Sequence, residues 1–447
     1  MTFVDATVGQ VPGRMVRGVP TSHPGDDVTV ADVIVVVEAQ HSTSGLRPVT
    51  VAADLGNEVV FVTDTPDRYT DLPTFAAVTA AAGVEAATGA TGDTEGLLAT
   101  VESVTRGRRL RGIYTNCDYN LPVVAAAARK LGLPGLDPDA ALRARNKLLS
   151  RQVFTAAGVP CPRFVHAVTP ADARAAAADL GLPCVVKPMT ESASTGVRLC
   201  HTVEDVVAHH AVIAAEPYDA RGQRRPPGAL IEEYTLGYEV SVETVTLDGV
   251  ITVLGVTDKL LGPHPYFAEV GDTFPSLLPE PVVTALADTA TAALRAIGHD
   301  FGAAHTEVKM TADGPRVIEV NARLGGAEIA TQVEAALGVP VLREVVRMHL
   351  GEKPQLTPTR RRGAAARYLM PPAAGRVTAV HGLALARRVP GVTDVEVRVA
   401  PGTVVGAPTS NHQLYGHVVA TAETAAEAAR RVDTAANQIS LQVENDR

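Results

Sequence analysis

The sequence predicts an α/β segment followed by an α+β segment, divided over several domains. Its 447 residues are enough for two to four domains at the usual ~100–200 residues each. Apolar runs of strand length alternate with helix-length segments over residues 28–135. Beyond residue 158 the pattern changes to a series of strands with fewer helices, which is typical of an α+β arrangement.

The composition excludes several classes of protein. Hydrophobic residues make up 46% and charged residues 20%, which disfavours disorder and fibrous folds. The formal net charge of −9 disfavours nucleic acids and anionic membranes as partners, because both attract basic surfaces. We expect no secretory signal, and no run approaches the ~20 apolar residues of a transmembrane helix.

The cysteines and one histidine pair carry no metal-binding pattern. No Cys-x-x-Cys pair is present, so reduced, mostly buried thiols in a cytoplasmic protein are expected. The cysteines are Cys117, Cys161, Cys184 and Cys200. The adjacent His209 and His210 are expected on a solvated helix face.

Residues 28–135 are predicted to form a Rossmann-like domain. The β-branched run at 33–37 is typical of a strand buried on both faces. Strands alternating with helices of ~10–15 residues indicate a parallel sheet. Further strands are expected at 58–62 and 112–114, and helices at 46–55, near 72–82, at 95–106 and at 121–131. Residues 1–27, rich in Gly, Pro, Thr and Asp, are expected to form a flexible arm.

The loop after the first strand lacks a dinucleotide fingerprint. Residues 38–45 read E-A-Q-H-S-T-S-G where a G-x-G-x-x-G motif would stand. A nicotinamide-dependent oxidoreductase is therefore disfavoured. The loop remains a candidate for holding a small substrate at the strand ends.

The rest of the chain is predicted to hold one long helix, many strands and a small C-terminal unit. The helix is expected at 140–157, and residues 223–228 (Q-R-R-P-P-G) as an exposed loop. Strands are expected at 184–187, 197–200, 229–234, 239–247, 250–259, 303–310 and 315–320. Two prolines and three arginines at 353–362 indicate a linker. A strand at 395–399 and an Ala-rich helix at 422–436 follow.

The first chemistry-bearing segment joins a lysine to a loop of small residues. A predicted buried strand ends at Lys187, and a loop over 192–196 follows. Small residues let backbone N–H groups approach phosphate oxygens, and an ammonium group neutralises their charge. On its own, the pattern does not separate a phosphate site from a solvated loop, and it is not a Walker A motif.

The second segment is an apolar strand that runs into acidic residues. Residues 230–235 read L-I-E-E-Y-T, and Glu239 follows. Its backbone could pair with the edge of an adenine, and a carboxylate could hold ribose hydroxyls. A half-buried strand with exposed acids is the alternative.

The third segment is the most informative and is predicted to be a β-hairpin. Two strands flank the turn at Asp313-Gly314, and period-2 alternation places Glu307 and Lys309 on one face. The same alternation places Glu319, Asn321 and Arg323 on one face. Two carboxylates and an amide oxygen suit Mg²⁺, and an arginine can hold a carboxylate or a developing anion. A cross-strand ladder of ion pairs is the alternative, but it leaves the glycines at 325 and 326 unexplained.

The ordered combination of these motifs resembles the ATP-grasp superfamily. The resemblance runs from about residue 30 to the C-terminus, and the string V-I-E-V-N-A-R-L-G-G at 317–326 is its most specific piece. Within the superfamily the chain is similar to carboxylate–amine ligases, particularly the L-amino-acid ligases that make dipeptides such as bacilysin. Residues 259–275 are similar to their substrate loop, although Asp272 stands where some of them have histidine.

The resemblance implies a division into domains. Residues 28–135 would form a pre-ATP-grasp, Rossmann-like domain. Residues 136–352 would form the ATP-grasp domain, with a lid at about 160–235. Residues 353–447 would form a small α+β subdomain.

The resemblance also implies roles for residues. Lys147 and Lys187 would hold the ATP phosphates, and Arg323 would hold a substrate carboxylate and the oxyanion together with Gly325 and Gly326. The remaining nucleotide contacts would be Ser192, Ser194, Thr195, Gly196, Glu232, Glu233, Tyr234, Thr235 and Glu239. Magnesium, as two ions, or manganese would bind Glu307, Glu319 and Asn321. Glu269, Asp272 and His305 would contact amino-acid substrates, although His305 fits a satisfied core histidine equally well.

The activity implied is ATP-dependent ligation of an amino acid, or a related carboxylate, to an amine through an acyl phosphate. A homodimer is expected as the commonest state of soluble enzymes, and the cysteines favour a cytoplasmic one. The resemblance adds a role in natural-product biosynthesis. Two alternatives stay open: a carboxylase or purine-pathway ligase that uses bicarbonate or formate, and a catalytically silent nucleotide-binding module.

Overall fold

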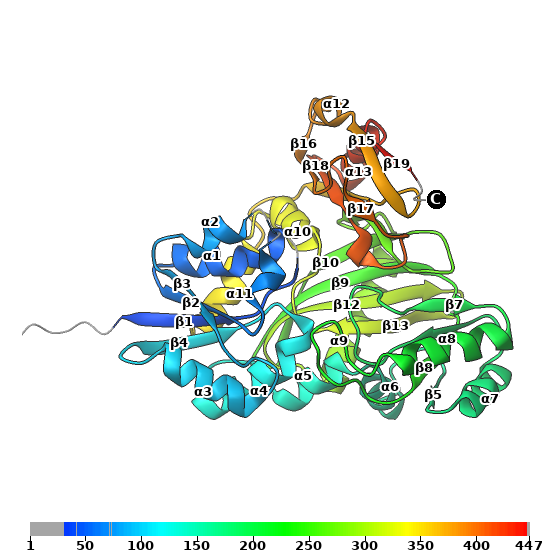
Figure 1. Ribbon diagram of the computed structural model, residues 1–447, viewed down its shortest axis with the longest axis horizontal. Helices are drawn as coiled ribbons and strands as arrows, with labels where there is room; N and C mark the ends of the chain where they lie inside the picture. Colours follow the sequence, from blue (N-terminus) through cyan, green and yellow to red (C-terminus); the bar gives the residue numbers. More distant parts are fainter. Residues whose placement is uncertain (1–30, 42, 71, 73, 445–447) are drawn as a thin grey trace, which may run out of the picture.

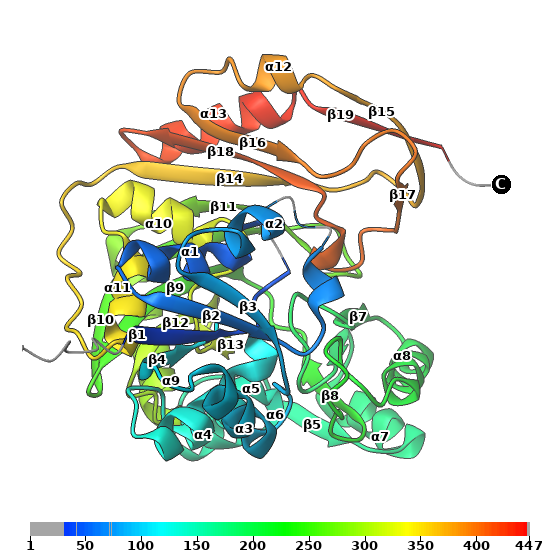
Figure 2. The ribbon, with the colours of Figure 1, turned by 60° about the vertical axis from the view of Figure 1, so that its left-hand side comes forward.

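The computed structural model describes residues 31–444 except 42, 71 and 73 (Figure 1). The arm expected at 1–27 therefore lies outside the described residues. Three parts surround a common centre in Figures 1 and 2: the N-terminal domain, the central sheet with its lid, and a C-terminal part that rises above both.

The N-terminal domain is built on a parallel sheet of strand order β3-β2-β1-β4. Its strands are β1 Asp32–Val37, β2 Glu58–Thr63, β3 Val84–Thr88 and β4 Arg109–Tyr114. Its helices are α1 Arg47–Asp54, α2 Phe75–Thr79, α3 Thr94–Val104 and α4 Leu121–Leu131, with short 3-10 turns η1 Thr43–Leu46, η2 Pro66–Tyr69 and η3 Asp118–Asn120. Alternate side chains of β1 enter two apolar clusters, so the prediction of a strand buried on both faces is confirmed.

Two predictions for this domain are wrong in detail. The helix expected near 72–82 is reduced to the five residues of α2, and β3 was not predicted. The β3 sequence V-E-A-A-T has little strand propensity, and β3 pairs only with β2 because it lies at the sheet edge.

The helix expected at 140–157 is two helices, α5 Pro138–Arg145 and α6 Lys147–Ala156. Asn146 separates them with an extended backbone (φ −104°, ψ 106°). Its side-chain oxygen accepts the N–H groups of Leu148 and Leu149 at 3.0 and 3.3 Å, which caps α6. The break places Lys147 at the first residue of α6.

The lid is a separate antiparallel sheet of order β5-β8-β6-β7 with its own apolar cluster. Its strands are β5 Phe164–Ala167, β6 Cys184–Lys187, β7 Arg198–Cys200 and β8 Ala229–Glu233, and its helices are α7 Pro170–Leu180 and α8 Val203–Ala215. His209 and His210 are buried in α8 and contact the carbonyl oxygens of Gly196 and Ala167, so the expected solvated face is wrong.

The central sheet has eight strands in the order β13-β12-β9-β10-β11-β14-β18-β16. They are β9 Tyr238–Leu247, β10 Val250–Leu261, β11 Glu269–Phe274, β12 Gly302–Thr311, β13 Gly314–Asn321, β14 Gly363–Leu369, β16 Val392–Val397 and β18 Gly416–Ala422. Helices α9 Glu280–Ile297, α10 Ile329–Leu337 and α11 Val341–His349 accompany it. Pairing of β11 with β14 carries the sheet across the domain boundary expected at 352/353.

The C-terminal part adds a small sheet of order β17-β15-β19. Its elements are β15 Gly375–His381, β17 Val404–Val405, β19 Ser440–Glu444, α12 Leu383–Ala386, α13 Ala425–Ala436 and the turn η4 Asn411–Gln413. Residues 351–362 form neither helix nor strand, as expected of a linker. In the described part of the chain, every helix is too short or too polar to cross a bilayer.

Candidate active site

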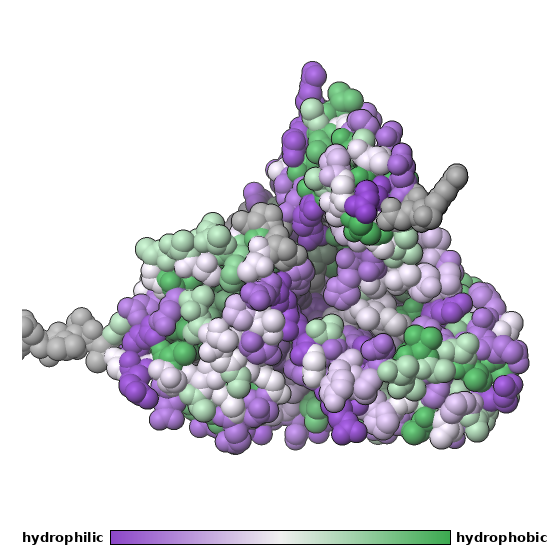
Figure 3. Space-filling model, viewed as in Figure 1, coloured by the Kyte–Doolittle hydropathy of each residue, from purple (hydrophilic) through white to green (hydrophobic). Residues whose placement is uncertain are grey.

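A cavity of about 840 Å³ lies where the central sheet, the lid, the N-terminal domain and the C-terminal part meet. Figure 3 shows the surface hollowed between these parts. Side chains from β9 to β13 line one side, which we call the floor. Loops over 188–197, 216–228, 262–268 and 398–415 line the opposite side, which we call the roof.

The β12–β13 hairpin supplies the acidic centre of the floor. Glu307 pairs directly with Glu319 across the two strands, and His305 pairs with Asn321. All four side chains line the cavity, as does Lys309. The predicted shared face is therefore confirmed, although the register shifts by one residue after Glu307.

Lys259 of β10 neutralises this centre. Its Nζ lies 2.5 Å from Glu307 Oε1, 3.5 Å from Glu239 Oε1 and 3.8 Å from Glu269 Oε2. Burial opposes protonation of Lys259, but the surrounding carboxylates outweigh it and raise its pKa well above the ordinary value. Burial likewise opposes ionisation of Glu307, but Lys259 and His305 hold its pKa well below the usual range.

Lys147 links the hairpin to the roof. Its Nζ lies 2.9 Å from Glu319 Oε1 and donates to the backbone oxygen of Glu191 at 2.7 Å. Its backbone N–H donates to the oxygen of Met189 at 2.9 Å. One side chain thus connects a carboxylate of the floor to the loop after β6.

Lys187 lies in a buried charge cluster at the end of β6. Its Nζ is 2.6 Å from Glu232 Oε2, and Arg151 Nε is 2.7 Å from Glu232 Oε1. Burial lowers the pKa of Lys187, with Glu232 acting against it. Because two cations hold the carboxylate of Glu232, this residue can offer a ligand mainly its backbone.

The residues after Glu232 form the cavity wall at the root of the lid. Glu233 is ion-paired with Arg316, and Tyr234 Oη lies 3.1 Å from His264 Nε2. The backbone oxygen of Thr235 accepts a bond from Lys309 Nζ at 3.4 Å. Glu239 Oε2 lies 3.4 Å from the same lysine nitrogen.

The loop between β6 and β7 has an unusual backbone. Ala193 and Ser194 have φ values of 57° and 58°, in the region that favours glycine. The Ser194 hydroxyl donates to the oxygen of Phe267 at 2.9 Å, and the Asn411 N–H donates to the oxygen of Ala193 at 3.0 Å. Contacts from outside the lid therefore hold this loop over the cavity.

Arg323 is held by an acid of the N-terminal domain. Its Nη2 donates to Asp118 Oδ2 at 2.7 Å, and the Ser192 hydroxyl donates to the same oxygen at 2.7 Å. Burial opposes the charge on Arg323, but Asp118 outweighs it and raises the pKa. Asp118 thus connects the arginine after the hairpin to the roof.

Glu269 and Asp272 lie on β11 with different exposures to the cavity. Glu269 lines it, and burial followed by the charge of Asp272 raises the pKa of Glu269 well above the ordinary value. Asp272 is fully buried behind the wall, where the Tyr368 hydroxyl donates to it and Gln332 Nε2 lies at 3.5 Å. Its side chain does not reach the cavity.

His305 is both a buried core residue and part of the cavity wall. Its Nδ1 lies 3.0 Å from Glu243 Oε1, and its Nε2 lies 3.6 Å from Glu307 Oε1. Burial lowers its pKa, but the two glutamates outweigh it and raise the value to about 9. The side chain is therefore a cation between two acids at neutral pH.

Several buried polar atoms of cavity residues have no hydrogen-bond partner in the described residues. They are Thr195 Oγ1, Thr235 Oγ1, Glu269 Oε1 and Arg323 Nε. Unpaired buried groups cost free energy, so a polar ligand that met them would be favoured.

The hairpin donors fit magnesium as part of a larger ligand set. Within the described residues, no group of three or more His, Cys, Asp and Glu side chains could hold a metal by itself. Glu307, Glu319 and Asn321 nevertheless present oxygen donors on one face. Mg²⁺ commonly binds one or two carboxylates and takes its other ligands from phosphates and water, so the donor set is suitable.

Three family models match successive parts of the chain. They are the ATP-grasp N-terminal domain over residues 49–135, the ATP-grasp domain over 180–331, and the L-amino acid ligase C-terminal domain 2 over 367–444. The protein y4rH of Sinorhizobium fredii is 31% identical over 360 residues, which cover 80% of this chain and 74% of that protein. The chain belongs to the ATP-grasp superfamily.

Within the superfamily its named relatives are ligases, and the chain is similar to the L-amino acid ligase type. Alanine–anticapsin ligase of Bacillus subtilis is 29% identical over 260 residues, 54% of each chain. Human carnosine synthase 1 is 30% identical over 273 residues, 58% of this chain but 32% of that protein. The L-amino acid ligase structure from Bacillus licheniformis shares the fold, with a TM-score of 0.75, 22% identity and coverage of 94% and 100% of the two chains.

The ATP-grasp cavity brings most of the predicted site residues together. Those that line it are Lys147, Lys187, Ser192, Ser194, Thr195, Glu232, Glu233, Tyr234, Thr235, Glu239, Glu269, His305, Glu307, Glu319, Asn321, Arg323 and Gly326. Gly196, Asp272 and Gly325 do not line it. A Cβ at Gly325 would lie 2.7 Å from Ile329 Cγ2, so packing explains that glycine.

Other cavity residues of this ATP-grasp ligase were not predicted from sequence. Lys259 lies inside the string quoted for the substrate loop, but much of that string is strand, in β10 and β11. Asp118 of η3, Arg221 of the loop 216–228 and Asn411 of η4 come from three different parts of the chain, and no local pattern distinguishes them. Arg225, in the loop expected to be exposed, is ion-paired with the buried Glu191.

Proposed function

We propose that the chain joins an amino acid, or a related carboxylate, to an amine or a second amino acid. ATP would be converted to ADP and phosphate through an acyl-phosphate intermediate. The observation that carries this proposal is the opposition of Glu307 and Glu319 beside Lys147, in a cavity that also contains Arg323. The match to an L-amino acid ligase C-terminal domain supports it.

In this proposal the nucleotide lies between the lid and the floor. Residues 232–235 frame the adenine and Glu239 binds the ribose. Lys147, Lys187 and the loop over 192–196 contact the phosphates. Glu307, Glu319 and Asn321 would hold Mg²⁺ or Mn²⁺, as two ions, which would supply positive charge to offset that of the phosphoryl group.

The chemistry then follows from the poor reactivity of a carboxylate. A carboxylate oxygen attacks the γ-phosphorus of ATP, so a C–O–P bond forms and ADP leaves. A neutral amine attacks the acyl carbon, the C–O bond breaks, and phosphate leaves with the carboxylate oxygen. Arg323 and backbone N–H groups near Gly326 stabilise the oxyanion, and Glu269, which lines the same cavity, accepts the proton of the amine.

A phosphate-release screen over pairs of amino acids tests this function, with mass detection of the product. It should include non-proteinogenic acids, and separate mixtures should contain bicarbonate or formate instead. We expect release of ADP and phosphate with at least one amino-acid pair, and a product one water lighter than the two substrates together. Phosphate release with only bicarbonate or formate would indicate a carboxylase or purine-pathway type. No ATP turnover in any mixture would indicate a silent nucleotide-binding module.

A further inference from the structure

A loop of the lid reaches from the lid to the N-terminal domain. Residues 216–228 connect α8 to β8, and Tyr218 forms an isolated bridge with Arg224. Asp219 Oδ1 accepts the N–H groups of Arg221 and Gln223, both at 2.9 Å. The turn thereby carries Arg221 at its tip, on an ordered backbone.

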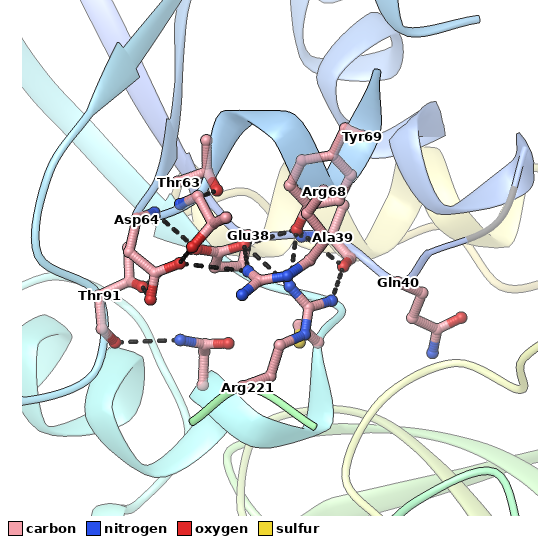
Figure 4. Close-up of polar contacts among 12 residues, drawn as sticks. Glu38, Ala39, Gln40, Thr63, Asp64, Arg68, Tyr69, Thr91 and Arg221 are labelled. Atoms are coloured by element: carbon pink, nitrogen blue, oxygen red, sulfur yellow. Dashed lines mark hydrogen bonds and ion pairs between the residues drawn. The ribbon is translucent and has the colours of Figure 1, made fainter. Parts of the chain in front are cut away.

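The receiving site lies at the carboxyl ends of the parallel strands. Glu38 directly follows β1 with a φ of 52°, and its side chain is 1% exposed. Its Oε1 accepts the Asp64 N–H at 2.9 Å and the Thr91 hydroxyl at 3.1 Å, while its Oε2 accepts the Tyr69 hydroxyl at 2.5 Å (Figure 4). The carboxylate is therefore held rigidly by the N-terminal domain alone.

Arg221 completes this network from the lid. Its Nη1 donates to Glu38 Oε2 and to Tyr69 Oη, both at 3.0 Å, and its Nη2 donates to the oxygen of Ala39 at 2.7 Å (Figure 4). The guanidinium carbon lies 5.8 Å from the ring centroid of Tyr69 and 5.9 Å from that of Tyr119. Only 8% of the Arg221 side chain is exposed.

The position of this ion pair explains the missing glycine fingerprint. In open parallel sheets, ligands bind at the carboxyl ends of the strands, where a dinucleotide fold places its phosphates. Here the side chain of Glu38 occupies that position, and its Oε2 is already ion-paired with Arg68 of the N-terminal domain at 3.2 Å. The crevice instead receives a cation from the lid of the same chain.

Few polar contacts join the lid to the N-terminal domain among the described residues. Apart from Arg221, they are the bonds of Ser192 to Asp118 and of Tyr119 to Glu191. The apolar cluster of the lid includes no residue of the N-terminal domain in the described part of the chain. Contacts of this kind can form and break as a unit, because separation returns the charged groups to water.

Arg221 also lines the cavity, together with Ala220. We propose that Arg221 is a positioning residue. By binding Glu38 and Tyr69 it fixes the position of the lid relative to the N-terminal domain and closes this side of the cavity. The inference rests on the proposed function, because closure matters most while an acyl phosphate exists. Water that attacks this intermediate regenerates the carboxylate and releases phosphate, so ATP is consumed without product.

The test uses the full chain and compares Arg221→Ala with Arg174→Ala. Arg174 is a matched control, because it lies on the lid helix α7 in an exposed ion pair with Glu204 at 3.5 Å. We expect Arg221→Ala to raise the ratio of phosphate to amide product from about one to about three or more, while Arg174→Ala keeps the wild-type ratio. Arg221→Lys retains the positive charge but cannot donate two hydrogen bonds from a planar guanidinium group. We therefore expect its phosphate-to-product ratio to lie between those of the wild type and Arg221→Ala.

Hydrogen exchange of residues 216–228 gives a second readout that does not depend on catalysis. We expect Arg221→Ala to accelerate exchange there by about tenfold or more, and Glu38→Gln, which keeps an acceptor but removes the charge, to give an intermediate effect. If Arg221→Ala folds poorly, Glu38→Gln tests the same contact from the other side.

The two proposals fail in distinguishable ways. An unchanged phosphate-to-product ratio together with unchanged exchange in Arg221→Ala would overturn the positioning role, even if the wild-type enzyme makes amides. Absence of phosphate release by the wild-type chain would instead count against the proposed function.

Discussion

The floor and the roof of the cavity are built in different ways. The floor consists of side chains on paired β-strands, where Glu307 lies opposite Glu319 and Lys259 neutralises the centre. The roof consists of loops that are held by contacts of a few residues, such as Arg221 and Asn411. Strands fix atoms more closely than loops do, so we propose that the reacting groups belong to the floor, and that closure and exclusion of water belong to the roof.

The largest effect is expected from a change on the floor. Glu319→Ala removes one of the two opposed carboxylates and should reduce ATP turnover by at least about 1,000-fold, because the proposed metal site loses one of its two carboxylates. Asp313→Ala, in the exposed turn of the same hairpin, is the matched control and should keep activity. Steady-state ADP formation and circular dichroism check both variants. Normal ATP turnover by a folded Glu319→Ala variant would contradict the proposal that the floor carries the reacting groups.

A smaller loss is expected at the arginine that follows the hairpin. Arg323→Ala removes a charged donor to the oxyanion and should lower kcat by roughly 100- to 1,000-fold. Arg323→Lys should recover only part of this loss, because one ammonium cannot contact both Asp118 and a substrate. Kinetics at saturating ATP measure the effect. A change in KM with an unaltered kcat would contradict a role in the transition state.

A change in the roof should be smaller still. Asn411 Oδ1 accepts the Glu269 N–H at 2.8 Å, and the backbone N–H of Asn411 donates to the backbone oxygen of Ala193. Asn411→Ala removes the side-chain bond, which corresponds to roughly a 2- to 10-fold rise in KM for ATP or the amino acids with little change in kcat. Initial-rate kinetics with each substrate varied separately provide the check. A loss of kcat as large as that of a floor variant would remove the distinction between the two regions.

Two histidines that do not line the cavity, the buried His299 and the partly buried His349, should affect stability rather than catalysis. Burial lowers the pKa of His299 and of His349 to about 4, whereas an unfolded chain has a value near 6.5. Between these values the unfolded chain binds protons that the folded protein does not. At neutral pH the free energy of unfolding should therefore be about 3 kcal/mol higher per histidine than at pH 4. This stability is lost as the pH falls from 6.5 towards 4.

Denaturant titrations at several pH values measure this loss. His349→Phe should remove the part of the pH dependence that His349 contributes, and it should keep the packing, because His349 contacts the rings of Tyr114 and Phe301 and an aromatic side chain can replace it. His381→Asn, at an exposed position of β15, is the control. An unchanged pH dependence in His349→Phe would assign the loss of stability to other groups.

The same contrast explains what the sequence could predict. The β-branched run of β1 and the hairpin that carries Glu307 and Glu319 follow a period of two, so a local pattern identified them. The edge strand β3 has no such pattern, and β11 lies in a string that resembles a loop. β3 is formed by pairing with β2, and β11 by pairing with β10, so tertiary contacts rather than local sequence determine both strands.

The missed site residues share one physical reason. Asp118 contacts Arg323 across 205 positions of sequence, and Arg221 contacts Glu38 across 183. These pairs arise only when separate domains meet around the cavity. The helix break at Asn146 is different, because an asparagine that caps a new helix is a local signal and the sequence could have indicated it.

The central claim is that the carboxylate is activated by direct transfer of a phosphoryl group. The most direct test uses an acid substrate labelled with ¹⁸O in both carboxylate oxygens, incubated with ATP and an amine partner that gives product. The account predicts one ¹⁸O in each phosphate released and one in each amide formed. Amide formation with unlabelled phosphate would contradict it.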